Sequence, residues 1–175
     1  AGKDTATAVA TAAAKQTEEQ ANETPASGID TSSYPCILTE ADFLQLLKRL
    51  PEVELVAFDT ETTSLDYMQA ELVGISVATA PGQAWYIPVG HDYLGAPEQL
   101  TRDVVLAALK PWLEDAAAPK VGQNIKYDTH VLANHGITVR GWQHDTLLES
   151  YVFEAHLTHS LEKLAERHLG RQGLS

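Results

Sequence analysis

The sequence has few of the features that point to secretion, to a membrane or to non-specific binding of nucleic acid. Its 175 residues contain one cysteine, Cys36, so no disulfide can form within the chain, and we expect a cytoplasmic, bacterial protein. No apolar run is long enough to span a bilayer, and the Ala- and Thr-rich start does not resemble a signal peptide. With 12 basic and 24 acidic residues the formal net charge is −12, which argues against a protein that holds nucleic acid by surface charge alone.

Composition divides the chain into two parts. Residues 1–34 are rich in Ala, Thr, Gln and Glu and have almost no large apolar side chains, so we expect a disordered linker. Residues 35–175 carry the apolar patterns, and the overall hydrophobic content of 44% is enough for one folded domain. The linker and the missing initiator Met suggest a segment of a longer protein.

Apolar periodicity in residues 35–175 predicts alternating helices and strands. Thr39 has the position of a helix N-cap, Pro51 ends that helix, Pro111 kinks a later one, and Gly136 closes another. Short connections between the first three strands imply antiparallel pairing, and the order that follows is that of a ribonuclease H-like α/β fold with a mixed sheet. The predicted helices cover residues 39–50, 101–115, 125–136, 145–155 and 160–169, and the predicted strands cover residues 53–61, 71–79, 83–89, 120–124 and 137–139.

Three acids follow predicted strands in this order. Asp59 and Glu61 are two positions apart at the end of the first strand, so both side chains point to one face. Asp128 follows the fourth strand, in the first turn of the next helix. Sites in such sheets form at the carboxyl ends of strands, so we expect the three acids to converge there.

Clustered carboxylates suit hard cations with oxygen ligands, and like charges that close repel unless a cation or proton lies between them. We therefore expect two divalent ions, Mg²⁺ or Mn²⁺, held by Asp59, Glu61 and Asp128. Two such ions support phosphoryl displacement, because they activate a water and stabilise the leaving oxygen. By spacing alone, Asp-x-Glu is a weak signal, since most such pairs are solvated strand ends or caps.

Longer motifs resemble the 3′–5′ proofreading exonuclease domain of bacterial family A DNA polymerase I. They are "FDTETTSL", "AWYIPVGHDYL", "LKPWLED", "KVGQNIKYD" and "DTLLESYV", and the resemblance runs from about Cys36 to Gly170. It implies that Asp59 bridges both metals, that Glu61 binds one and helps to orient the attacking water, and that Asp128 holds the second ion, directly or through water.

The resemblance also implies contacts with a single-stranded or frayed 3′ end of DNA. Leu65 would wedge against the terminal bases, and Asn124 and Tyr127 would position the 3′-terminal nucleotide. The parent chain, expected to be a monomer, would carry a polymerase domain downstream and a 5′ nuclease domain upstream, and would serve replication and repair.

The sequence departs from the family at its third motif, Tyr-x-x-x-Asp, which supplies a further metal ligand. After Tyr151 the chain reads "YVFEA", with Ala155 in place of the Asp, and we expect the chain to end before this motif. On that reading residues 1–175 alone are inactive or weakly active.

Other interpretations of these residues stay open. Leu65 could belong to the core and Tyr127 could pack against the protein, whereas Asp145 has the position of a helix N-cap and His91 that of a loop residue. The chain could also be a non-catalytic exonuclease-fold scaffold of the polymerase, or a free-standing exoribonuclease of the same acidic superfamily.

Overall fold

The computed structural model describes residues 34–170, so the predicted linker lies outside the described residues except for Tyr34. Residues 34–161 form one compact unit, and the segment from Glu162 onward, which contains most of helix α6 (Leu161–Leu169), belongs to a second. None of the helices in residues 34–170 is both long and apolar enough to cross a lipid bilayer.

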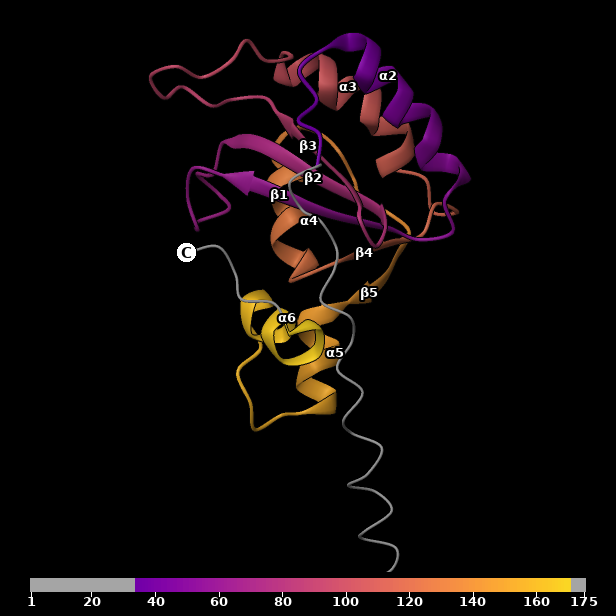
Figure 1. Ribbon diagram of the computed structural model, residues 1–175, viewed down its shortest axis with the longest axis vertical. Helices are drawn as coiled ribbons and strands as arrows, with labels where there is room; N and C mark the ends of the chain where they lie inside the picture. The colour runs from indigo at the N-terminus through magenta and orange to yellow at the C-terminus, as the bar shows by residue number, and fades with distance from the viewer. Residues whose placement is uncertain (1–33, 171–175) are drawn as a thin grey trace, which may run out of the picture. The chain divides into compact units, whose positions relative to one another are not determined.

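A five-stranded mixed sheet forms the centre of the first unit (Figure 1). The strand order is β3-β2-β1-β4-β5; β1, β2 and β3 pair antiparallel, and β4 runs parallel to β1 and β5. This arrangement confirms the predicted α/β class and the three antiparallel strands. The strands are β1 (Val56–Thr62), β2 (Leu72–Ala80), β3 (Gln83–Pro88), β4 (Lys120–Gly122) and β5 (Trp142–Asp145).

The helices of this unit begin and end close to the predicted positions. Thr39 caps the first helix, because its hydroxyl accepts the backbone N–H of Asp42 at 3.2 Å, and Pro51 lies in the 3₁₀ turn after it. Pro111 lies inside α3 (Arg102–Leu113), two residues before its end. Gly136 follows α4 (Ile125–Asn134) with a φ of 71°, as a C-terminal glycine should. The elements are α2 (Glu40–Arg49), η2 (Leu50–Glu52), α3 (Arg102–Leu113), α4 (Ile125–Asn134) and α5 (Thr146–Phe153).

The two faces of the sheet differ in what covers them. In β1 the alternate residues Val56, Phe58 and Thr60 are buried, and this core face packs against α2, α3 and α4. The opposite face, called the open face here, is bordered by a hollow of about 240 Å³ beside Asp59. The open face consists of Ala57, Asp59 and Glu61 of β1, Gly74, Ser76 and Ala78 of β2, and Ala84 and Tyr86 of β3.

The strand predicted at residues 137–139 is wrong, and β5 lies at Trp142–Asp145 instead. Ile137 and Val139 are apolar because their side chains are in the core, not because they belong to the sheet. Gly141 then turns the chain with a φ of 77°, and a Cβ there would overlap the carbonyl oxygen of Ala118. The real strand was missed because "WQHD" is mostly polar.

Candidate active site

Two carboxylates share the open face at the end of β1. Asp59 and Glu61 are two positions apart in the strand, and the residues opposite them on β2, Ser76 and Gly74, are small. Burial and the neighbouring charge of Glu61 raise the pKa of Asp59, whereas a hydrogen bond from the backbone of Thr60 lowers it. The pair therefore favours a bound proton or cation.

Asp128 reaches β1 at the residue between these two acids. Asp128 is 1% exposed, and its Oδ1 accepts the backbone N–H of Thr60 at 2.9 Å and the Thr60 hydroxyl at 2.6 Å. Burial raises the pKa of Asp128 to about 7; the side chain of Thr60 lowers it, and the charge of Asp59 raises it. Asp59 and Asp128 are thus close enough to repel each other when both are ionised.

Asp128 nevertheless meets β1 from a different side than the other two acids. Thr60 points to the core, whereas Asp59 and Glu61 belong to the open face. Within residues 34–170 there is no group of three His, Cys, Asp or Glu side chains close enough together to hold a metal ion. The carboxylates fit hard divalent ions in donor type.

One carboxylate fixes the start of the helix that carries Asp128. Asn124 precedes α4 in the left-handed conformation, with a φ of 59°. Asp145 accepts the backbone N–H groups of Asn124 and Ile125, each at 3.1 Å, and also those of Leu147 and Leu148, at 3.0 and 3.4 Å. The predicted N-cap of α5 is confirmed, and the same side chain also holds the first turn of α4.

The predicted substrate-binding residues lie near the same end of β1. Leu65 is 96% exposed, so the interpretation as a core residue is wrong. Tyr127 is half-buried; its hydroxyl donates to the carbonyl of Ser64 at 2.5 Å and also bonds to Thr62. Tyr127 therefore braces the loop that presents Leu65. The Asn124 residue is exposed at the start of α4.

Sequence reasoning missed Thr60, although a signal for it was present. A polar residue between two acids of a strand points to the core, where it needs a partner. That partner, Asp128, comes from α4, and only the assembled sheet identifies it.

A family described as 3′–5′ exonuclease matches residues 34–174. DNA polymerase I of Pseudomonas aeruginosa is 53% identical over 140 residues, which cover 78% of this chain and 15% of the polymerase. The chain thus spans a small part of the length of that relative.

Solved structures also share the fold, among them the following two. The POL domain of Pol1 from M. smegmatis, solved with a DNA primer-template and dNTP, superposes with a TM-score of 0.62 at 26% identity, over 78% of this chain and 23% of that one. NrnC of Brucella melitensis with bound Mg²⁺ gives a TM-score of 0.56 at 22% identity, over 81% of this chain and 63% of that one. The second likeness concerns the fold alone.

Proposed function

From the premise that this chain belongs to the 3′–5′ exonuclease family found in bacterial DNA polymerase I, we propose that it removes nucleotides from the 3′ end of DNA. The observation that carries the proposal is the bond from Thr60 to Asp128, which brings a third carboxylate to the backbone between Asp59 and Glu61. Acids from two distant segments thereby meet at the end of one strand.

We assign the three acids to metal binding. Asp59 is the shared ligand, because it lies on the same face of β1 as Glu61 and is the chain neighbour of Thr60, to which Asp128 is bonded. Two divalent ions, Mg²⁺ or Mn²⁺, when bound, supply an activated water and charge stabilisation at the leaving 3′ oxygen. Glu61, the most exposed of the three, orients the attacking water, and Thr60 keeps Asp128 beside the strand.

The substrate in this proposal is a single-stranded or frayed 3′ end of DNA. Leu65 rests against the terminal bases, and Asn124 contacts the terminal nucleotide. Tyr127 helps to position the same nucleotide, because its hydroxyl holds the loop that carries Leu65. Because metal and backbone contacts carry no base information, sequence preference is low.

We propose a domain layout that is consistent with the same premise. Residues 35–175 form the exonuclease part of a monomeric bacterial polymerase in the cytoplasm, and residues 1–34 link it to a 5′ nuclease domain. A polymerase domain downstream supplies the melted primer end. A further metal ligand from a Tyr-x-x-x-Asp segment, which does not follow Tyr151 in these 175 residues, completes the site.

The test uses the full-length gene product and a 5′-labelled single-stranded oligonucleotide. Asp59→Asn removes the negative charge of the proposed shared ligand and keeps the shape of its side chain. We expect the rate of mononucleotide release in Mg²⁺ to fall by at least about 10²-fold. Asp103→Asn, an exposed acid in the first turn of α3, is the matched control and should leave the rate unchanged. Ca²⁺ should permit DNA binding while slowing hydrolysis, because its looser geometry positions water poorly.

The two alternative functions give other results. A non-catalytic scaffold releases no nucleotides with any divalent ion, even from the unsubstituted protein. An exoribonuclease degrades an RNA oligonucleotide faster than the DNA of the same sequence. An Asp59→Asn variant with full activity would overturn the metal assignment itself.

A further inference from the structure

A tyrosine on the outermost strand lies on the same face as the two acids of β1. In the sheet register Tyr86 of β3 is opposite Ser76 of β2, and Ser76 is opposite Asp59. Directly paired residues project to the same face of a sheet. Tyr86 thus belongs to the row of the open face that contains Asp59, two strands away.

The Tyr86 ring does not lie over Ser76, the residue paired with Tyr86, but over Gly74 of the same strand. A Cβ built on Gly74 would overlap the phenol oxygen and the ring carbons next to it. Gly74 is the residue opposite Glu61, and opposed side chains in an antiparallel pair start about 4.5–5.5 Å apart at Cβ. The phenol oxygen therefore takes the place of a side chain neighbouring Glu61.

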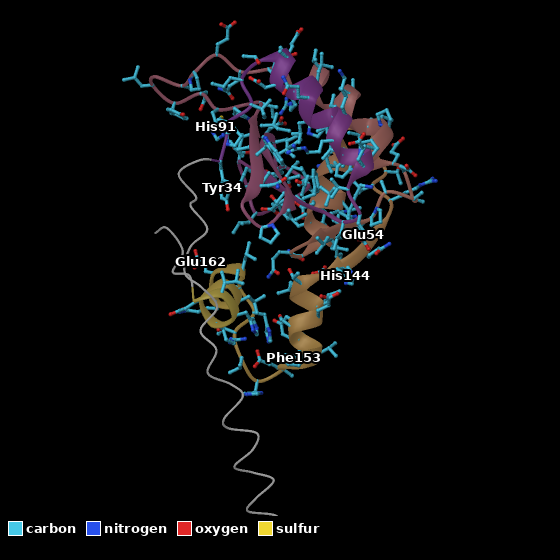
Figure 2. The ribbon with its side chains drawn as sticks, turned by 45° about the vertical axis from the view of Figure 1, so that its right-hand side comes forward. Tyr34, Glu54, His91, His144, Phe153 and Glu162 are labelled. Atoms are coloured by element: carbon cyan, nitrogen blue, oxygen red, sulfur yellow. The ribbon has the colours of Figure 1, made fainter. Side chains whose placement is uncertain are left out.

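His91 fixes the phenol in that place. It lies beyond the end of β3 (Figure 2), and its Nε2 is 2.5 Å from the Tyr86 hydroxyl. Its backbone is held in turn, because Gln99 accepts the N–H of His91 at 2.9 Å and donates to its carbonyl at 2.7 Å. When His91 donates from Nε2, the Tyr86 hydroxyl keeps its own proton for another acceptor.

The electrostatics of the phenol agree with this placement. Burial raises the pKa of Tyr86 to about 12, and the charge of Glu61 is the next largest cause. Glu61 is therefore the acidic side chain whose charge the phenol experiences most.

We propose that Tyr86, held by His91 and admitted by the bare backbone of Gly74, is a positioning residue that donates a hydrogen bond to Glu61 and orients its carboxylate toward a divalent cation. The role rests on the proposed function, since it concerns the metal site of the same reaction. Partners that orient ligands in this way are worth about 10–100-fold in metal affinity or activity.

The central experiment measures Mn²⁺ affinity in the full-length gene product by calorimetry, with no DNA present. Tyr86→Phe removes one oxygen, and we expect the dissociation constant to rise about tenfold. Tyr93→Phe removes an exposed hydroxyl from the neighbouring ring, which lies edge-on to His91, and should leave the constant within twofold. Equal constants for Tyr86→Phe and the unsubstituted protein would overturn the inference.

A double-mutant cycle separates positioning from a general structural effect. If Tyr86 acts through Glu61, adding Tyr86→Phe to Glu61→Gln should change Mn²⁺ affinity by less than about twofold, although it costs tenfold on its own. Equal losses in both backgrounds would show that Tyr86 does not act through Glu61. Gly74→Ala provides an independent variant: its methyl group displaces the phenol, and we expect a loss at least as large as that of Tyr86→Phe.

Kinetics distinguish failure of this inference from failure of the proposed function. With an active protein, Tyr86→Phe should lower kcat and raise the half-saturating Mg²⁺ concentration, with the KM for DNA nearly unchanged. A protein without exonuclease activity would refute the proposed function, while the Mn²⁺ cycle would still decide whether Tyr86 orients Glu61. An active protein in which Tyr86→Phe has normal kcat and Mg²⁺ dependence would refute the inference alone.

Discussion

The core face and the open face of the sheet are made by the same strands, and they treat polar groups in opposite ways. On the core face Thr60 is buried, and both its N–H and its hydroxyl are bonded to Asp128. On the open face Glu61 is exposed beside Gly74, with room for the phenol of Tyr86. A polar group on the core face must be satisfied within the protein, whereas one on the open face stays available to a ligand.

Asp128 contacts the core face, and its ionisation there has a cost in free energy. Its carboxylate is bonded on the core side, yet the charge of Asp59 on the open face raises its pKa. A buried carboxylate is costly to ionise, and a bound cation offsets that cost. Asp128 is thus a buried carboxylate between the two faces whose ionisation is costly in the absence of a cation.

The largest expected effect is on stability as a function of pH in the absence of metal. The pKa of Asp128 is raised from its ordinary value to about 7 by burial, so the folded protein binds this proton more tightly than the unfolded chain. The stabilisation is full below about pH 4 and is lost as the pH rises to about 7, and it amounts to at most roughly 4 kcal/mol. Urea unfolding in EDTA should show this decline, and Asp128→Asn should remove it.

Two controls sharpen that experiment. Asp103→Asn, at an exposed position, should keep the decline. Added Mg²⁺ should restore stability at pH 8 to the unsubstituted protein and much less to Asp128→Asn. Parallel curves for Asp128→Asn and the unsubstituted protein would show that Asp128 is not the group responsible.

A smaller effect is expected when the partner of Asp128 loses its hydroxyl. Thr60→Val keeps the volume and the backbone N–H but leaves a buried carboxylate with one bond fewer. We expect a loss of about 1–3 kcal/mol in the free energy of unfolding at pH 8. Thr60→Ser keeps the hydroxyl and should recover most of the loss. Equal stability of the Val and Ser variants would mean that the 2.6 Å bond contributes little.

The contrast between the faces also explains how much of the molecule the sequence reveals. Local patterns give the helices, the three antiparallel strands and the cap at Thr39, because period and capping are properties of neighbouring residues. They fail at residues 137–139, since apolar residues pack equally well from a loop. They also miss β5, whose polar residues join the sheet through parallel pairing with β4.

The site divides in the same manner. Asp59 and Glu61 can be predicted from alternation within one strand, and Asp128 from the order of strands and helices. The bond from Thr60 to Asp128 and the lean of Tyr86 over Gly74 depend on register and on contacts between distant segments. The double use of Asp145 is similar, because its second helix, α4, begins 20 residues earlier.

Thr39 and Asp145 are both predicted from the sequence as helix N-caps, but they differ in how many helices they hold. Thr39 caps only α2, whereas Asp145 serves α5 and the turn that begins α4. Asp145→Asn still caps α5 through its amide oxygen, but its amide nitrogen cannot accept the N–H of Ile125 that Oδ2 accepts, so we expect a loss of about 1–2 kcal/mol in stability and a higher Mg²⁺ requirement. Thr39→Ala should cost about 1 kcal/mol and leave the Mg²⁺ requirement unchanged.

The smallest effect on stability is expected at Leu65, which is 96% exposed. Leu65→Ala removes no packed surface and should change the free energy of unfolding by less than about 0.5 kcal/mol. If Leu65 rests against the terminal bases, the KM for single-stranded DNA should nevertheless rise several-fold. Leu94→Ala is the matched control, because Leu94 is equally exposed on another loop, after β3. Equal KM values for Leu65→Ala and Leu94→Ala would contradict the contact between Leu65 and the 3′ end of the DNA. The loop that Tyr127 braces would then serve some other purpose, since Leu65 is 96% exposed and packs against nothing in the fold.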